Sequence, residues 1–89
     1  MGDDAVARDS GIRSADRVLR ILDEIAAAPH GLTAADVAHR LDLSTATAYR
    51  LLGTLVARDY LARSADARYV LGRAVDGLGR AVRSQLVAT

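Results

Sequence analysis

Residues 43–55 read Leu-Ser-Thr-Ala-Thr-Ala-Tyr-Arg-Leu-Leu-Gly-Thr-Leu, and no acidic residue occurs between Ser44 and Arg58. Ser44 has the chemistry of an N-cap, so we expect a helix over residues 44–58. Positions in a helix are spaced 100° apart, which separates this one into two faces. The apolar face that should pack inward consists of Ala48, Leu51, Leu52, Leu55 and Val56. The opposite face is unusually small and holds Ala46, Arg50, Gly53 and Ala57.

The segment before this helix predicts two further helices. Thr33 and Asp36 form a capping-box pattern ahead of a short amphipathic helix over 34–41, and a tight break at 42–44 follows. An earlier helical pattern over 15–28 has Ser14 as its expected N-cap, and residues 1–13 are expected to form a flexible arm. Two short helices joined by a turn of this length are typical of a helix-turn-helix.

Beyond Asp59 the period changes from helical to extended. Residues 60–63 and 68–71 predict two short strands joined by a four-residue loop, which would form a wing. A final helical pattern occupies residues 73–89, with an apolar stripe at Leu71, Val75, Leu78 and Val82. The expected fold is mainly α with a small β-hairpin: a winged helix-turn-helix, with a three-helix core plus wing over 14–72, followed by a linker helix.

Composition narrows the function classes. A chain of 89 residues is enough for one small domain, and it contains no Cys and only two His. No nucleophile–base pair, paired-carboxylate site, phosphate-binding Gly loop or metal-ligand cluster occurs, so we expect no enzyme, cofactor or metal site. No apolar run reaches the ~18 residues of a membrane span, and the amino terminus does not resemble a secretory signal, so we expect a cytoplasmic protein.

The net charge of +1 conceals a strong asymmetry. Residues 1–43 carry 5 Arg and 8 acidic residues, whereas residues 44–89 carry 7 Arg and 3 acidic residues, which gives −3 and +4. All 12 basic residues are Arg, whose planar donor fork suits phosphates and guanine edges.

The acid-free face of residues 44–58 favours insertion into the major groove of double-stranded DNA. The groove is about 12 Å wide, and a helix with small side chains around one Arg fits it. We expect Arg50 to read a base and Ala46 to contact a thymine methyl. Phosphate contacts are expected from hydroxyls, and the candidates are Ser44, Thr45, Thr47 and Thr54. The alternative is that Arg50 is an ordinary surface residue and Tyr49 a packing residue.

Three further Arg residues are candidates for phosphate contacts. Arg63 and Arg68 lie at either side of the predicted wing loop, and Arg17 lies near the start of the first predicted helix. The alternatives are that the wing residues only protect an exposed strand edge from aggregation, and that Arg17 pairs with Asp16 or Asp23.

Several motifs together resemble the N-terminal domain of IclR-type transcriptional regulators: Ser14-Ala-Asp-Arg17, the run from Thr47 through Tyr49-Arg50-Leu-Leu to Thr54, and Tyr69-Val-Leu-Gly72. The resemblance covers about residues 12–83. It implies a homodimer on a palindromic or pseudo-palindromic operator, more often a repressor than an activator, with base contacts near Thr45, Thr47, Tyr49 and Arg50. It also implies a C-terminal domain that binds a small-molecule effector and is absent from this chain.

The sequence departs from the family pattern at four positions. Asp42 and Asp59 replace common glycines, so we expect positive φ at both, which Asp tolerates better than most residues. Ser44 and Thr45 replace a common Pro-Lys, so the family's operator preference does not carry over.

The apolar stripe of the last helix is a candidate dimerisation surface, together with the first helix. The alternative function is a winged-helix module for protein–protein interaction or dimerisation without specific DNA binding.

Overall fold

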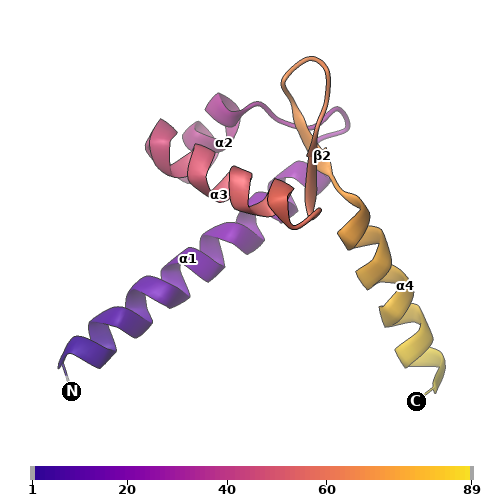
Figure 1. Cartoon of the computed structure of the whole chain (residues 1–89), viewed down its shortest axis with the longest axis horizontal. Helices are drawn as coiled ribbons and strands as arrows, with labels where there is room; N and C mark the ends of the chain where they lie inside the picture. Colours follow the sequence, from indigo (N-terminus) through magenta and orange to yellow (C-terminus); the bar gives the residue numbers. More distant parts are fainter. Residues whose placement is uncertain (1, 89) are drawn as a thin grey trace.

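In the part of the chain that the structure describes, four helices and one small antiparallel sheet follow one another in the order of a winged helix-turn-helix. The computed structural model describes the backbone of residues 2–88 and the side chains of residues 11–87. The elements are α1 (Gly2–Ala27), α2 (Ala34–Leu41), α3 (Thr45–Ala57), β1 (Leu61–Arg63), β2 (Tyr69–Leu71) and α4 (Arg73–Ala88). Figure 1 shows that the wing loop projects from one end of the body, while the free ends of α1 and α4 diverge at the opposite end. None of the helices in this described part combines the length and apolarity needed to cross a membrane.

The core is a thin layer of aliphatic side chains between the three helices and the sheet. Its largest fully buried side chains are Ile21 of α1, Val37 of α2, Leu52 of α3 and Leu61 of β1. Each fully buried aliphatic side chain of this size contributes about 1.5–3 kcal/mol relative to exposure. Tyr69 of β2 is the one aromatic side chain in this cluster. The core therefore joins all three helices to the wing.

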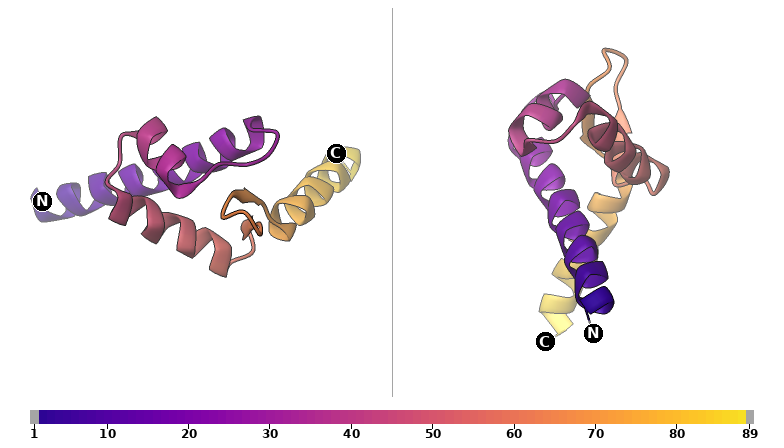
Figure 2. Two further views of the ribbon diagram at one scale, coloured as in Figure 1. Left: turned by 90° about the horizontal axis from the view of Figure 1, so that it is seen from above. Right: turned by 90° about the vertical axis from the view of Figure 1, so that its left-hand side faces the viewer.

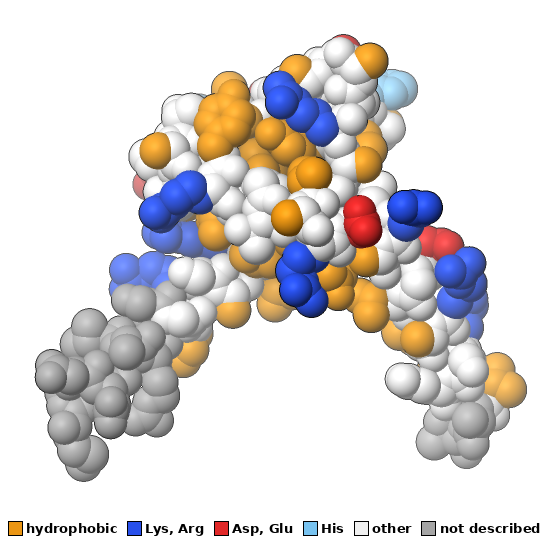
Figure 3. All heavy atoms as spheres, viewed as in Figure 1, with side chains coloured by type: hydrophobic (Ala, Val, Ile, Leu, Met, Phe, Trp, Pro, Cys, Tyr) orange, Lys and Arg blue, Asp and Glu red, His pale blue; other side chains and the backbone are white. Residues whose placement is uncertain are grey.

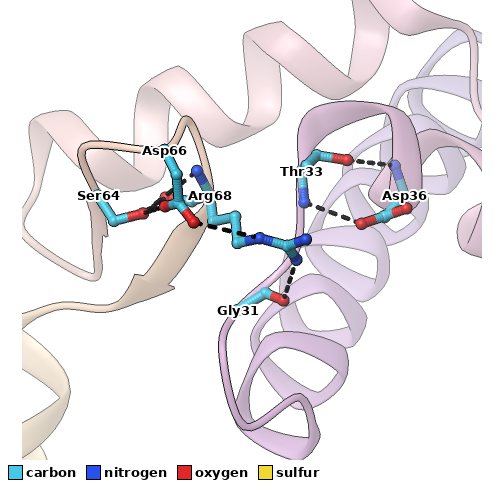
Figure 4. Close-up of polar contacts among 6 residues, drawn as sticks. All are labelled: Gly31, Thr33, Asp36, Ser64, Asp66 and Arg68. Atoms are coloured by element: carbon cyan, nitrogen blue, oxygen red, sulfur yellow. Dashed lines mark hydrogen bonds and ion pairs between the residues drawn. The ribbon is translucent and has the colours of Figure 1, made fainter.

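The capping box expected at Thr33 is present. The Thr33 hydroxyl accepts a hydrogen bond from the Asp36 N–H at 3.1 Å, and the Asp36 carboxylate accepts one from the Thr33 N–H at 3.1 Å (Figure 4). The hydrogen bond from the Thr33 N–H is the largest cause that holds the pKa of Asp36 below its ordinary value, and the Thr33 side chain lowers that pKa further. The start of α2 is therefore fixed by its own side chains.

Positive φ occurs at both positions where Asp replaces Gly. Asp42 ends α2 with φ 55°, and Asp59 follows α3 with φ 64°, so both expectations are confirmed. Ala67, in the wing loop, also has φ 64°, which the sequence did not indicate. Gly31 has φ 77°, and a Cβ there would collide with the carbonyl oxygen of Tyr69.

That close approach brings the wing against the loop before α2. Leu32 forms an isolated antiparallel bridge with Tyr69, and the two N–H···O distances are 3.1 and 2.7 Å. Within the hairpin, Leu61 pairs with Leu71 and Arg63 with Tyr69.

One boundary predicted from the sequence is wrong. The first helix begins at Gly2 and not at residue 15, so residues 2–13, expected as a flexible arm, are helical and Ser14 lies inside α1. This stretch contains no Pro, and one internal Gly costs a helix only about 1 kcal/mol. Leu71 lies on β2, as the predicted strand 68–71 implies, so the apolar stripe that continues along the last helix begins on a strand.

The start of α4 is fastened to the end of α3. The Ala74 N–H donates to the Asp59 carbonyl at 2.9 Å, and the Gly72 N–H donates to the Tyr60 carbonyl at 2.9 Å. A Cβ on Gly72 would collide with that same Asp59 carbonyl. No free linker therefore separates the wing from α4.

Gly72→Ala is expected to lower the free energy of unfolding by about 1–3 kcal/mol, because the added methyl group must displace backbone. Gly77→Ala is the matched control, since a Cβ at that helical position meets nothing within 4 Å. It is expected to raise the free energy of unfolding by about 0.5–1 kcal/mol. Urea denaturation of the two variants measures both changes, and equal changes would contradict the close approach at Gly72.

Acid titration tests the capping box. Because its pKa is lowered in the folded state, Asp36 binds a proton more readily in the unfolded chain. Its contribution to stability is therefore present at neutral pH and is lost as the pH falls through its folded-state pKa. Asp36→Asn should remove this part of the pH dependence. Asp23→Asn, at an exposed site of α1, should leave it intact, as measured by urea denaturation between neutral and acidic pH.

Candidate nucleic-acid interface

The turn between α2 and α3 sets the direction of α3. The Leu43 N–H donates to the Ala38 carbonyl at 2.8 Å, which closes the left-handed end of α2 at Asp42. Ser44 then caps α3, and its hydroxyl oxygen accepts a hydrogen bond from the Thr47 N–H at 3.1 Å. Both views of Figure 2 show α3 on the outside of the three-helix body, and the right-hand view places it on the same side as the wing.

The two faces of α3 are divided as the helical spacing predicts. Ala48, Leu52 and Leu55 are buried, and Leu51 and Val56 are half-buried against the core. The outer positions are solvent-exposed: Ala46, Tyr49, Arg50, Gly53, Thr54 and Ala57. Tyr49, for which a packing role was the alternative, is 51% exposed and lies on the outer side.

The hydroxyl groups of α3 differ in what they can still donate. Ser44 donates its proton to the Thr47 hydroxyl oxygen at 2.9 Å, and Thr54 donates to the Arg50 carbonyl at 3.1 Å. Thr47 accepts from Ser44, so its own proton is available to an outside acceptor, and it is polarised by the bond it receives. Thr45 is exposed at the first turn. Thr45 and Thr47 are therefore the hydroxyl groups best prepared to donate to a phosphate.

Arg50 and Arg17 are cations without an acidic partner in the described part of the chain. Arg50 is exposed on α3, and Arg17 is half-buried on α1. The ion pairs among described side chains are Arg40–Glu24, Arg68–Asp66 and Arg80–Asp76. The alternative that pairs Arg17 with Asp16 or Asp23 is therefore wrong.

The two Arg residues of the wing have different surroundings. Arg63 is exposed, and its guanidinium lies 5.8 Å from the centre of the Tyr69 ring, a cation–π distance. Arg68 lies 3.5 Å from the Asp66 carboxylate and donates to the Gly31 carbonyl at 3.4 Å (Figure 4). Arg68 thus ties the wing to the loop before α2, a structural role that no local sequence signal indicates.

An acidic residue occupies the wing loop. The Ser64 hydroxyl donates to Asp66 and, with the Arg68 charge as a smaller cause, holds the pKa of that carboxyl below its ordinary value. Asp66 is therefore negatively charged at neutral pH. This charge makes the loop tip less suited to phosphate than the strand that carries Arg63.

A second surface of the domain is apolar and lies at its other end. Val18, Leu19 and Leu22 of α1 line a groove of about 420 Å³ together with the end of α3 and Leu78 of α4. Leu19 is 61% exposed, and Leu78 and Val82 are each 52% exposed. Figure 3 shows apolar side chains along the inner edges of the two diverging helices. Of the predicted stripe, Val75 is half-buried and Leu71 lies on β2, away from the helical positions.

The chain is similar to transcriptional regulators over most of its described fold. The "HTH-type transcriptional regulator BhcR" of Paracoccus denitrificans (strain Pd 1222) is 53% identical over 53 residues, which are 58% of this chain and 19% of that protein. The Agobacterium tumefaciens repressor BlcR matches with a TM-score of 0.74 and 33% identity, over 84% of this chain and 30% of BlcR. The IclR of Thermotoga maritima matches with a TM-score of 0.74 and 25% identity, over 80% of this chain and 29% of that chain.

This chain thus spans less than a third of the length of each of these relatives. Their descriptions are those of a transcriptional regulator and a repressor, not of enzymes. The model of the IclR helix-turn-helix domain matches residues 14–65, which is more than half of the chain and includes α2, α3 and β1. The sequence motifs, the winged-helix geometry and these matches agree, and the chain therefore belongs to the IclR family of DNA-binding helix-turn-helix proteins.

Proposed function

We propose that this domain binds a specific double-stranded operator by inserting α3 into the major groove. The observation that carries the proposal is the outer face of α3, which is exposed, free of acidic residues and centred on Arg50. A helix that enters DNA must bring no negative charge against the phosphates and must leave its donors unoccupied. The face carries no acidic residue, and the Arg50 guanidinium has no acidic partner among the described side chains, whereas the Thr54 proton is used by the Arg50 carbonyl.

The phosphate contacts that orient α3 come from its first turn and from the wing. Thr45 and Thr47 supply free hydroxyl protons, and the N-terminal end of α3 adds the positive end of its dipole. Arg63 is the cation of the wing that contacts the backbone or minor groove beside the site. Ser44, Thr54 and Arg68 act mainly by holding these elements in place, and Arg17 is a further cation for the backbone.

The domain acts as a homodimer whose apolar groove between α1 and α4 is filled by a second copy. Leu19 and Leu78 are large apolar side chains exposed on facing helices, and water contact at such a surface is unfavourable. A symmetric pair of heads matches a palindromic or pseudo-palindromic operator.

In the cell, the domain serves a cytoplasmic transcription regulator that we expect to repress. Among its structural relatives, BlcR is described as a repressor. Another relative, an IclR homologue from Microbacterium hydrocarbonoxydans, was crystallised with 4-hydroxybenzoate and matches with a TM-score of 0.66 and 29% identity. This chain covers 27% of that protein, so we expect effector binding in a separate domain.

The competing function is a winged helix that binds another protein. The exposed apolar residues of α1 and α4 favour it, but they lie at the opposite end of the body from the wing. Salt separates the two functions, since affinity that depends on several phosphates falls steeply with salt concentration.

Arg50→Ala is expected to lower affinity for selected genomic DNA fragments by about 1–3 kcal/mol and to relax the preference at one base pair. Arg63→Ala is the matched control. It should weaken binding to all sequences alike and reduce the slope of log K against log salt by about one phosphate contact. Fluorescence anisotropy at several salt concentrations measures both effects. Unchanged affinity for Arg50→Ala would contradict the assigned face of α3, and salt-independent binding would favour the protein partner.

Leu78→Glu is expected to shift the chain from dimer to monomer, because it places a charge in the apolar groove. Ser84→Glu adds the same charge to an exposed position of α4 away from the stripe and should leave the dimer intact. Sedimentation velocity over a range of concentrations measures the association. A wild-type chain that stays monomeric at high concentration would contradict the homodimer for this chain.

A further inference from the structure

The exposed side chains of α3 offer a restricted set of chemical groups. Between Ser44 and Arg58 the chain has no Asn, Gln, Asp or Glu. Adenine is read in the major groove by an amide that both donates and accepts, and cytosine by a carboxylate that accepts. Neither group is present on this helix, and a Thr hydroxyl, which both donates and accepts, does not distinguish the bases, so α3 lacks the side chains that single out adenine or cytosine.

The donor that is present fits guanine. Arg50 extends from the exposed face, has no acidic partner among the described side chains and is surrounded by Ala46, Gly53 and Ala57. These small neighbours let the helix backbone approach the base edges. A guanidinium fork then reaches the O6 and N7 acceptors of guanine, a pattern that no other base presents.

Apolar contacts remain available on the N-terminal side of Arg50. Ala46 precedes it by four residues, about 6 Å along the helix axis, which corresponds to about two base-pair steps. Tyr49 is half exposed next to it and presents a large apolar ring. In the major groove the apolar group of a base is the C5-methyl of thymine.

We propose that each half-site is read directly at one G·C pair, by Arg50 on the guanine, and at thymines within about two base pairs, by Ala46 and Tyr49 on their methyl groups. This inference rests on the proposed function, because it names the base chemistry of the operator that α3 enters. Preference at all other positions then comes from the shape and flexibility of the DNA.

Base analogues test the inference. A duplex is first selected from a randomised library with the 89-residue chain, and the guanine and thymines of its enriched motif are then replaced singly. Replacing the guanine with 7-deazaguanine, which lacks N7, should weaken binding about five- to tenfold. Replacing a contacted thymine with uracil removes only the methyl group and should weaken binding about fourfold.

Two controls test whether the loss of affinity with 7-deazaguanine arises in the major groove and depends on Arg50. Inosine keeps O6 and N7 and lacks only the minor-groove amino group of guanine, so it should bind like guanine. Arg50→Ala should lose affinity and become insensitive to 7-deazaguanine, whereas Arg63→Ala should bind more weakly and stay sensitive.

The outcomes separate this inference from the proposed function. If a motif is enriched but its binding ignores 7-deazaguanine and uracil, the domain is a sequence-specific DNA binder and the direct readout is wrong. The same holds if inosine is discriminated and 7-deazaguanine is not, because recognition would then lie in the minor groove. If no motif is enriched, both the proposed function and the inference are overturned.

Discussion

The pair of backbone hydrogen bonds between Leu32 and Tyr69 holds the wing to the helical body. They form only because Gly31 has no side chain, since a Cβ would strike the Tyr69 carbonyl. Arg68 strengthens the same junction through the Gly31 carbonyl, and the Tyr69 ring completes the core from the wing side. With this junction in place, a hairpin of two three-residue strands keeps a fixed position beside α3, although an isolated hairpin of that length would be marginal.

Local chemistry made most of the fold predictable from the sequence. The cap at Ser44, the capping box at Thr33 and Asp36, and the positive φ at Asp42 and Asp59 each depend on one residue and its immediate neighbours. The start of α1 was not predictable in the same way. Ser14 has good cap chemistry but lies inside a helix, because a residue that can cap is also tolerated within a helix when the chain before it stays helical.

In the candidate site, too, features set by local sequence could be predicted and those set by distant contacts could not. Which side of α3 faces outward followed from its periodicity, because the core contacts repeat with the helix. The roles of Arg63 and Arg68 did not follow, since the two look equivalent in sequence. Arg68 donates to the carbonyl of Gly31, 37 residues earlier in the chain, and a contact between residues so far apart cannot be predicted from the local sequence pattern.

The fastening of α4 has a mechanical consequence. The Asp59 carbonyl, two residues after the end of α3, accepts a hydrogen bond from the Ala74 N–H of α4. Gly72 packs so closely against the same carbonyl that a side chain would not fit between them. α4 is thus joined without a flexible linker to the segment that follows α3, the helix that we propose to enter DNA. We expect a rotation of α4 to be felt first at the C-terminal end of α3. In the proposed dimer, such rotations would change the distance between the paired α3 helices, and that distance selects the half-site spacing that the pair can span.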